Sequence, residues 1–140
     1  MVIMSVDLGL ARTGIAMCDR SQTLAFPKTV ISEHNPDRLV QKICELAQAE
    51  NAERIVVGYP RNVDGSAGSR AQACAELAER IERTSGIDTV LRDERYTTVS
   101  AHIALNAADV RGKKRKNTVD AVAATIILQD YLDYLKNISD

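Results

Sequence analysis

No apolar run in this chain approaches the ~20 residues that a membrane-spanning helix needs. The apolar start, Met1–Val6, is too short for a secretory signal and has no basic leader, so we expect a cytoplasmic protein without a membrane span. Internal repeats and low-complexity linkers are also absent. The length of 140 residues suits one core, and we expect a single domain over residues 1–140.

Cysteine and histidine are scarce, which argues against several kinds of metal and redox site. The three cysteines, Cys18, Cys44 and Cys74, are odd in number, widely spaced and never arranged as Cys-x-x-Cys. This pattern indicates free thiols that are buried as small hydrophobes in a reducing compartment. His34 and His102 lack the spacing of metal ligands, so we expect no zinc site.

Basic and acidic residues are nearly balanced in number. The formal net charge is −1, so the chain as a whole has no attraction for a polyanion. One dense basic run stands out, which contains Lys113, Lys114, Arg115 and Lys116. If the protein binds nucleic acid, this run must supply the affinity; the alternative is a solvated surface loop.

Three short β-rich stretches open the chain. They are rich in β-branched residues, are separated by glycines or a polar turn, and cover Val2–Leu8, Thr13–Asp19 and Thr23–Ile31. Pro27, within the third stretch, indicates an edge strand. We therefore expect an antiparallel meander at the start of the domain.

Helical and strand patterns then alternate. Asn35 and Pro36 predict the start of an amphipathic helix, and Ile55–Val57 predicts a strand that is buried on both faces. Next we expect a helix around Ala71–Ile81 that Gly86 ends, and a strand at Thr89–Leu91. A further helix should run from Thr97 or Thr98 to about Val110. After a basic loop, Thr118 should cap a last, buried helix from Val119 to about Leu135. The order βββαβαβαα indicates one α/β domain, a five-stranded mixed sheet flanked by helices.

The first candidate for chemistry is Asp7, at the carboxyl end of the first expected strand. Open α/β sheets place their sites at that edge. Gly9 and Gly14 allow a tight turn and the close approach of a phosphate, and Arg12 offers that phosphate a planar fork of donors. A plain hairpin with an aspartate in its turn is the alternative.

A second pair of acids, Asp93 and Glu94, directly follows the fifth expected strand. The fourth and fifth strands of such a sheet would lie beside the first, which would bring one of these acids within reach of Asp7. Successive side chains of a strand point to opposite faces, so we expect one of the two to enter the site. A solvated turn is the alternative.

Asp120 is the third candidate, because it is the only charged residue between Thr118 and Leu128 in an apolar helix. An acid in the first turn of a helix gains ~0.3–1 kcal/mol from the helix dipole, which is one explanation for it. A buried acid also needs a partner, and a metal ion is a strong one.

Together the three acids predict phosphodiester hydrolysis with two Mg²⁺ or Mn²⁺ ions. Two ions ~3.5–4 Å apart activate water, align it and stabilise the leaving oxygen, so no histidine base is needed. Mg²⁺ prefers oxygen ligands and keeps several waters, so a few carboxylates suffice.

The loop Gly58–Gly68 is a further candidate, for binding phosphate. It follows a strand and opens a helix, and it carries Arg61 and Asn62. It lacks the lysine and the spacing of a Walker motif, so the sequence does not support a P-loop ATPase. A simple surface loop is the alternative.

Four linked motifs resemble the YqgF/RuvX family. They are Asp7-x-Gly9-x-x-Arg12-x-Gly14, Val57-Gly58-x-Pro60 with Gly65 and Gly68, Asp93-Glu94-Arg95-x-Thr97-Thr98, and Asp120-Ala121-x-Ala123-Ala124. The tail Ile127–Leu132 also fits, so the match runs nearly from end to end. Tyr59 stands where leucine is expected, a departure that does not touch the acids.

The resemblance implies a ribonuclease H-like fold of the resolvase type and metal-dependent cleavage of phosphodiester bonds. It assigns the catalytic carboxylates to Asp7, Glu94 and Asp120, and Asp93 is kept as a further candidate metal ligand. Glu94 is preferred to Asp93 because related Holliday-junction resolvases carry glutamate in that strand. The candidate contacts to nucleic acid are Arg12, Arg61, Asn62, Arg95, Lys113, Lys114, Arg115 and Lys116.

The resemblance also bears on the substrate. Family members are linked to maturation of the 5′ end of 16S ribosomal RNA, and they were earlier proposed to resolve Holliday junctions. We favour precursor rRNA over branched DNA for a small cytoplasmic protein. The sequence itself does not separate RNA from DNA.

Two other classes stay open. Sugar kinases and actin-like ATPases also begin with an Asp-x-Gly hairpin, but they need two such domains; stabilisation by nucleotide would favour them. A module that binds structured RNA or recombination junctions without cutting is the second, and metal-independent binding without turnover would favour it. No helix reads as a dedicated dimer helix, so monomer and homodimer are both open.

Overall fold

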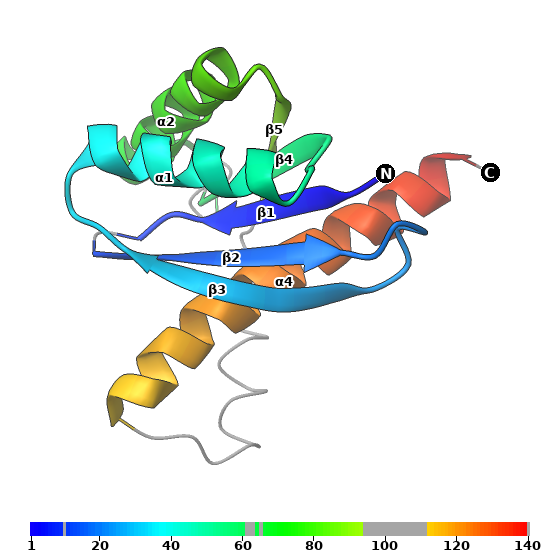
Figure 1. Cartoon of the computed structure of the whole chain (residues 1–140), viewed down its shortest axis with the longest axis horizontal. Helices are drawn as coiled ribbons and strands as arrows, with labels where there is room; N and C mark the ends of the chain where they lie inside the picture. Colours follow the sequence, from blue (N-terminus) through cyan, green and yellow to red (C-terminus); the bar gives the residue numbers. More distant parts are fainter. Residues whose placement is uncertain (10, 61–63, 65, 94–111, 140) are drawn as a thin grey trace.

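The computed structural model describes residues 1–9, 11–60, 64, 66–93 and 112–139, and for residues 112–120 and 139 it describes the backbone alone. Several predictions therefore lie outside the described residues: the helix from Thr97 or Thr98 to Val110, and the candidates Arg61, Asn62, Glu94 and Arg95. The described part comprises one sheet and the helices on its two faces (Figure 1).

Five strands form one mixed sheet in the order β3-β2-β1-β4-β5. They are β1 (Ile3–Asp7), β2 (Arg12–Cys18), β3 (Ala25–Ser32), β4 (Arg54–Tyr59) and β5 (Asp88–Asp93). The first three strands form the predicted antiparallel meander, whereas β4 and β5 run parallel to β1. The carboxyl ends of β1, β4 and β5 therefore meet at one edge of the sheet, where sites of open α/β sheets lie.

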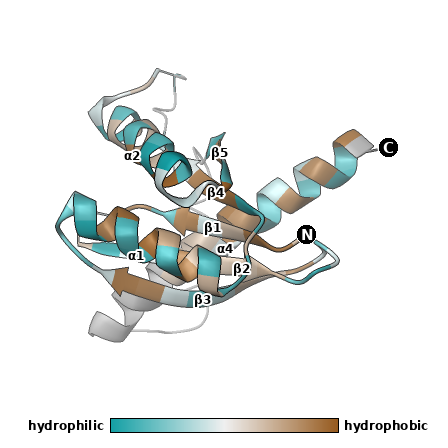
Figure 2. Ribbon diagram, turned by 45° about the horizontal axis from the view of Figure 1, so that its top comes forward, coloured by the Kyte–Doolittle hydropathy of each residue, from teal (hydrophilic) through white to brown (hydrophobic). Residues whose placement is uncertain are grey.

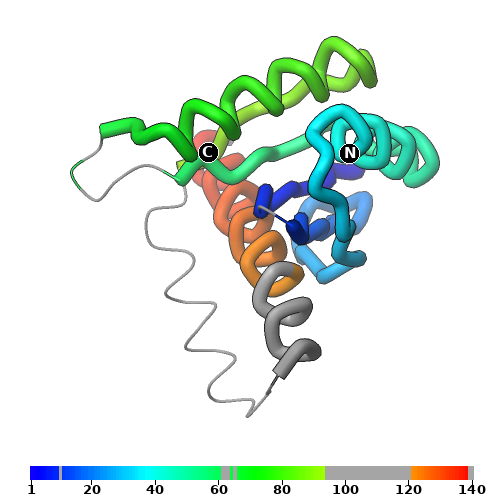
Figure 3. The backbone as a smooth tube through the Cα atoms, turned by 90° about the vertical axis from the view of Figure 1, so that its left-hand side faces the viewer, coloured from blue at the N-terminus to red at the C-terminus, as the bar shows by residue number. Residues whose placement is uncertain are grey.

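Helices cover both faces of the sheet. The helices α1 (Pro36–Ala49) and α2 (Ser69–Ser85) lie on one face, and α4 (Gly112–Ser139) crosses the other (Figure 3). The largest fully buried side chains on the α1/α2 face are Met4, Val6, Ile15, Ile43, Ile55, Val57 and Ile81, and those on the α4 face are Ile3, Val56, Ile127 and Leu128. Side chains of β1 and β4 thus alternate between two cores.

Hydropathy follows these layers (Figure 2). The central strands β1 and β4 are largely hydrophobic because helices cover both of their faces. By contrast β3, at the edge of the sheet, is mostly exposed, and it contains Pro27. The predicted edge position of Pro27 is confirmed.

Two helix ends follow their local signals. The side chain of Asn35 accepts hydrogen bonds from the backbone N–H groups of Asp37 at 2.9 Å and Arg38 at 3.1 Å, and Pro36 is the first residue of α1. Gly86 ends α2 in the left-handed conformation, with φ of 73°. Both predictions are confirmed.

The start of α4 corrects a prediction. The helix begins at Gly112, so Lys113–Lys116 lie in its first turns and not in a loop, and Thr118 is not its N-cap. Lysine and arginine are among the better helix formers, and neither proline nor glycine follows Gly112 within the helix. Nothing local therefore prevents the helix from extending through the basic run.

The three cysteines are buried and free, as predicted. Burial raises the pKa of the Cys18 and Cys44 thiols, so both stay protonated and unreactive at neutral pH. Within the described part of the chain, no helix has the length and apolar character of a membrane span.

Candidate active site

Asp7 is the last residue of β1, at the edge where the parallel strands end. Its neighbours determine which face of the sheet it occupies. Ser5, two residues earlier, donates a hydrogen bond from Oγ to the carbonyl oxygen of Ala124 in α4, at 2.7 Å. Because side chains alternate along a strand, Asp7 is directed to the same α4 face, where it is half-buried.

The backbone of Asp120 lies at the level of this carboxylate. The helix α4 runs antiparallel to β1, so its first turns lie toward the side of the sheet on which β1 ends, and Figure 1 shows them projecting below the sheet. Asp120 precedes Ala124 by four residues, a rise of ~6 Å along the helix. Asp7 follows Ser5 by two strand residues, ~6.6 Å in the same direction. The register of α4 on β1, marked by the hydrogen bond between Ser5 and Ala124, therefore places the backbone of Asp120 further toward this edge than Ala124.

Two glycines shape the space around Asp7. Gly14 is its direct partner in the β1/β2 ladder, so no side chain of β2 stands opposite the carboxylate. A Cβ at Gly9 would lie 2.1 Å from the carbonyl oxygen of Arg12, far inside van der Waals contact. The turn between β1 and β2 therefore requires glycine at position 9, because it approaches its own backbone there.

Arg12 shares the face of Asp7. It is the first residue of β2, two positions from Gly14, and strand alternation directs both to the α4 face. Its guanidinium is half-buried and can present a planar fork to a phosphate. Asp7 and Arg12 thus lie on the same face of the sheet.

The end of β5 presents its two last residues to opposite faces. Arg92 is directed to α4, where its Nε donates to Oδ2 of Asp130 at 2.7 Å. Asp93 follows it and pairs with Tyr59 of β4. By alternation Asp93 is directed to the α1/α2 face, the face opposite to that of Asp7.

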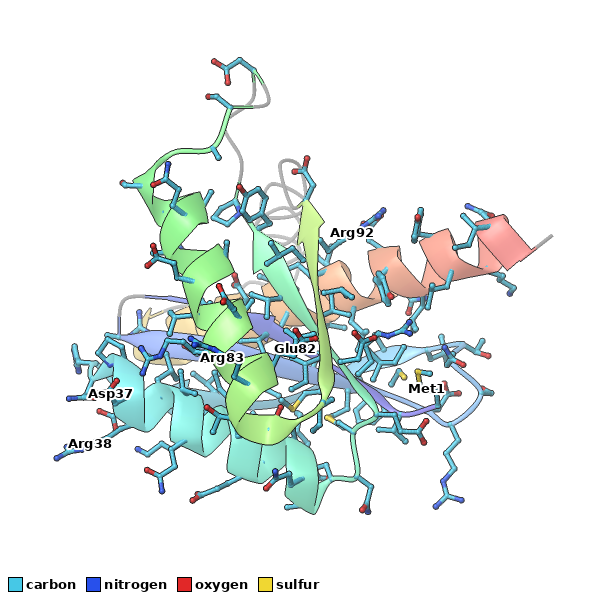
Figure 4. The ribbon with its side chains drawn as sticks, turned by 90° about the horizontal axis from the view of Figure 1, so that it is seen from above. Met1, Asp37, Arg38, Glu82, Arg83 and Arg92 are labelled. Atoms are coloured by element: carbon cyan, nitrogen blue, oxygen red, sulfur yellow. The ribbon has the colours of Figure 1, made fainter. Side chains whose placement is uncertain are left out.

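Sequence reasoning missed the link that Arg92 makes between β5 and α4. Figure 4 shows Arg92 beside that helix. Besides its ion pair with Asp130, the guanidinium lies 4.6 Å from the centroid of the Tyr134 ring. The signal available in the sequence was an arginine two positions after Val90 in an expected strand, and therefore on the same face as Val90. In the structure Val90 packs into the α4 core. This link holds the strand end next to the candidate acids against the helix that carries Asp120.

A matching link lies at the far end of the same strands. Arg54 donates from Nε to Oδ2 of Asp88 at 2.8 Å and from a terminal nitrogen to the hydroxyl of Tyr131 at 2.9 Å. The side chain of Arg54 is 26% exposed, and that of Arg92 is 28% exposed. The two links are therefore alike in chemistry and exposure, and they differ in their distance from Asp7.

Asp7 supplies at this edge an oxygen donor of the kind that Mg²⁺ and Mn²⁺ prefer. A half-buried carboxylate with a glycine opposite it is chemically suited to a divalent cation. No group of three potential metal ligands occurs among the side chains that the structure describes, which do not include those of Glu94 and Asp120.

The predicted phosphate loop is described at its two ends. Its strand end is Tyr59, the last residue of β4, and its helix end is Gly68, the N-cap of α2. Gly68 supplies no side-chain hydrogen bond to the first turn of α2. Backbone N–H groups at that helix start are therefore not capped by the residue that precedes them.

A family model described as RuvX, Holliday junction resolvase, matches residues 1–134. The chain belongs to the RuvX family. A relative from Bacillus cereus (strain G9842), named as a pre-16S rRNA nuclease, is 38% identical over 135 residues, which are 95% of this chain and 98% of that protein. A relative from Halothermothrix orenii with the same name is 39% identical over 134 residues, which are 96% of each chain.

A solved resolvase shares the fold of this RuvX-family chain. The structure of Thermus thermophilus RuvC in complex with a Holliday junction substrate matches with a TM-score of 0.63 at 12% identity, over 98% of this chain and 96% of that one. The predicted ribonuclease H-like fold is confirmed, and the predicted order of elements agrees over the part of the chain that the structure describes.

Proposed function

We propose that this RuvX-family chain is a metal-dependent nuclease that hydrolyses phosphodiester bonds at the 5′ end of precursor 16S rRNA. The observation that carries the proposal is the position of Asp7 at the strand edge, on the face that α4 covers and that Arg12 shares. Family membership and the nuclease names of the relatives support the reaction class. The choice of RNA follows the names of those relatives.

The proposed ligands of two Mg²⁺ or Mn²⁺ ions are Asp7, Glu94 and Asp120. When bound, such a pair of ions supplies Lewis-acid stabilisation of the attacking and leaving oxygens. Asp93 is the weaker candidate, because its side chain is directed away from the face of Asp7. Glu94, the next residue in the sequence, is the acid that the family resemblance favours.

Positive charge that would hold the substrate backbone is proposed at two places. Arg12 lies on the face of Asp7. Lys113 and Lys114 occupy the first turn of α4, where the helix dipole disfavours each cation by ~0.3–1 kcal/mol. That local cost indicates a role other than helix stability, and contact with a phosphate backbone is such a role. Further proposed contacts are Arg61, Asn62, Arg95, Arg115 and Lys116.

Cleavage of three labelled substrates tests the proposal. They are a precursor 16S 5′ leader, single-stranded RNA and a four-way DNA junction, each with Mg²⁺, with Mn²⁺ or with EDTA. We expect cutting of the leader with either ion and none with EDTA, because the carboxylates alone provide no electrophile. Preference for the junction would assign the substrate to branched DNA, which the family description favours. Binding without cutting in any condition would identify a binding module.

Removal of the Arg92–Asp130 link should slow cleavage without large loss of stability. Asp130→Ala frees the end of β5 from α4, and we expect kcat to fall about tenfold, because small misplacements of catalytic groups are costly. The control is Asp88→Ala, which breaks the Arg54–Asp88 ion pair between β4 and β5 at the far end of the strands and leaves the hydrogen bond of Arg54 to Tyr131 in α4. Both variants should lose at most about 1 kcal/mol of unfolding free energy, since both pairs are partly exposed.

The kinetic comparison separates positioning from stability. We expect Asp130→Ala to lower kcat with little change in KM, and Asp88→Ala to leave both unchanged. The double variant Arg92→Asp with Asp130→Arg restores an ion pair and should recover part of the lost kcat. If both single variants reduced activity equally, or if the swap recovered nothing, the link would have no part in positioning the site.

A further inference from the structure

A pocket of about 420 Å³ opens on the other side of the strand end that carries Asp7. It lies between the end of β1 and the first turns of α2, and its walls are mostly apolar. The side chains of Leu8, Ala73, Cys74 and Leu77 contribute most of these walls. This volume falls in the ~300–1,000 Å³ range of small-molecule sites, so the pocket admits one ring system but not a folded element.

One cation lines this pocket. A terminal nitrogen of Arg70 donates to the carbonyl oxygen of Leu8 at 3.0 Å, which holds the planar guanidinium against the pocket. Unpaired nucleobases bind to proteins by stacking on apolar surfaces and on arginine planes, with polar groups at their edges. A bare phosphate fits less well, because only Ser69 and Arg70 offer it side-chain donors and the apolar walls offer it none.

The pocket is adjacent to the proposed catalytic carboxylate. Leu8 and Gly9 line it and follow Asp7 directly in the chain. Asp7 is directed to the α4 face and Leu8 packs on the α1/α2 face, so the carboxylate and the pocket lie on the two sides of one strand end. A polynucleotide with one phosphate at Asp7 can therefore place a neighbouring base in the pocket.

We propose that this pocket binds one unpaired nucleobase of the substrate, next to the phosphate that is cut. The proposal rests on the proposed nuclease function for its ligand, and it goes further by requiring a single-stranded or unpaired nucleotide beside the cut. A paired base cannot enter such a pocket without leaving its stack. The pocket therefore selects unpaired segments over intact duplex.

The first test is nuclear magnetic resonance of the wild-type protein without metal. Adenosine 5′-monophosphate should shift the amide signals of Leu8, Gly9 and Ala73, and inorganic phosphate at the same concentration should not. Equal shifts with both compounds would assign the pocket to phosphate and overturn the proposal. Absence of shifts with the nucleotide would overturn it as well.

The second test measures binding of a fluorescent twelve-nucleotide single-stranded RNA in EDTA, with one base removed at each position in turn. For the wild type, loss of one particular base should weaken binding about tenfold, the typical effect of a stacked base. Ala73→Phe fills the pocket and should weaken binding of the intact RNA by the same factor, with no further loss at that abasic position. Gln72→Phe adds the same ring to an exposed position of α2 outside the pocket and should bind like the wild type.

Failure of this proposal and failure of the nuclease proposal give different results. If the wild type cuts RNA but Ala73→Phe binds and cuts like the wild type, the pocket assignment is wrong and the nuclease stands. If the base-specific effect appears but no substrate is ever cut with Mg²⁺ or Mn²⁺, the pocket stands and the nuclease is wrong. If the RNA does not bind in EDTA, the pocket assignment is wrong, and the nuclease proposal is decided by cleavage of the precursor leader with Mg²⁺ or Mn²⁺.

Discussion

Asp7→Asn is expected to slow metal-dependent cleavage roughly a thousandfold. Asparagine keeps the shape of the side chain but removes the negative charge that a divalent cation needs at this edge. Metal stabilisation of the transition state contributes several kcal/mol, and each 1.36 kcal/mol corresponds to about tenfold in rate. The measurement is single-turnover cleavage of the precursor leader at saturating Mg²⁺, with titration of Mn²⁺ to detect weakened metal binding.

Ser5→Ala is the matched control for this variant. Ser5 lies two residues earlier on the same strand and face, and its hydroxyl donates to the carbonyl oxygen of Ala124. Loss of that bond should lower the unfolding free energy by about 1 kcal/mol. The apolar packing of α4 on this face remains, so we expect a cleavage rate far above that of Asp7→Asn. If Asp7→Asn kept the wild-type rate and metal dependence, Asp7 would not be a metal ligand.

Thermal unfolding tests independently whether Asp7 binds a metal ion, through the variant Asp7→Asn. Carboxylates gathered without a metal repel one another, so removal of one charge should raise the melting temperature of the metal-free protein. Added Mg²⁺ should stabilise the wild type, because a ligand that binds the native state shifts the folding equilibrium. It should stabilise Asp7→Asn much less. Equal stabilisation of both proteins would place the metal elsewhere.

Gly9→Ala should have the second largest effect, on folding and activity together. The added Cβ would lie 2.1 Å from the carbonyl oxygen of Arg12, which is backbone and cannot rotate away. Relief of such a clash by shifts of the backbone costs about 1–3 kcal/mol. The shift moves the turn between Asp7 and Arg12, so we also expect weaker metal binding and slower cleavage. Chemical denaturation and the Mn²⁺ titration measure the two effects.

Gly86→Ala is the control that separates the effect of Gly9→Ala on the metal site from a general loss of stability. Gly86 has φ of 73°, and an added Cβ meets nothing within 4 Å, so the cost is backbone strain of about 1–2 kcal/mol. The residue ends α2 and is remote from Asp7. We expect Gly86→Ala to lower stability but to keep the metal affinity of the folded protein. A Gly9→Ala protein as stable and active as the wild type would contradict the tight turn.

Several elements follow from short stretches of sequence because the forces that form them are local. Asn35 caps α1 through backbone groups two and three residues away, and Gly86 ends α2 through its own backbone conformation. The burial of β1 on both faces, by contrast, depends on distant helices that pack on each side of the sheet. The same local signals do not mark the start of α4, because helix-forming lysines and arginines precede Thr118 without a break.

The candidate acids were visible in the sequence, since Asp7 and Asp120 interrupt apolar segments. The face of the sheet that Asp7 occupies was not, because it depends on the packing of α4 on β1, marked by the contact between Ser5 and Ala124, 119 positions apart. The opposite faces of Asp7 and Asp93 likewise depend on the pairing of β5 and on Arg92, whose partner Asp130 is 38 positions away. Motif composition and local caps are properties of neighbouring residues, so the sequence alone determines them. The face of the sheet that each candidate acid occupies, the register of the strands, and the links of Arg54 and Arg92 depend on distant segments packed around one sheet. Only the tertiary structure decides these features.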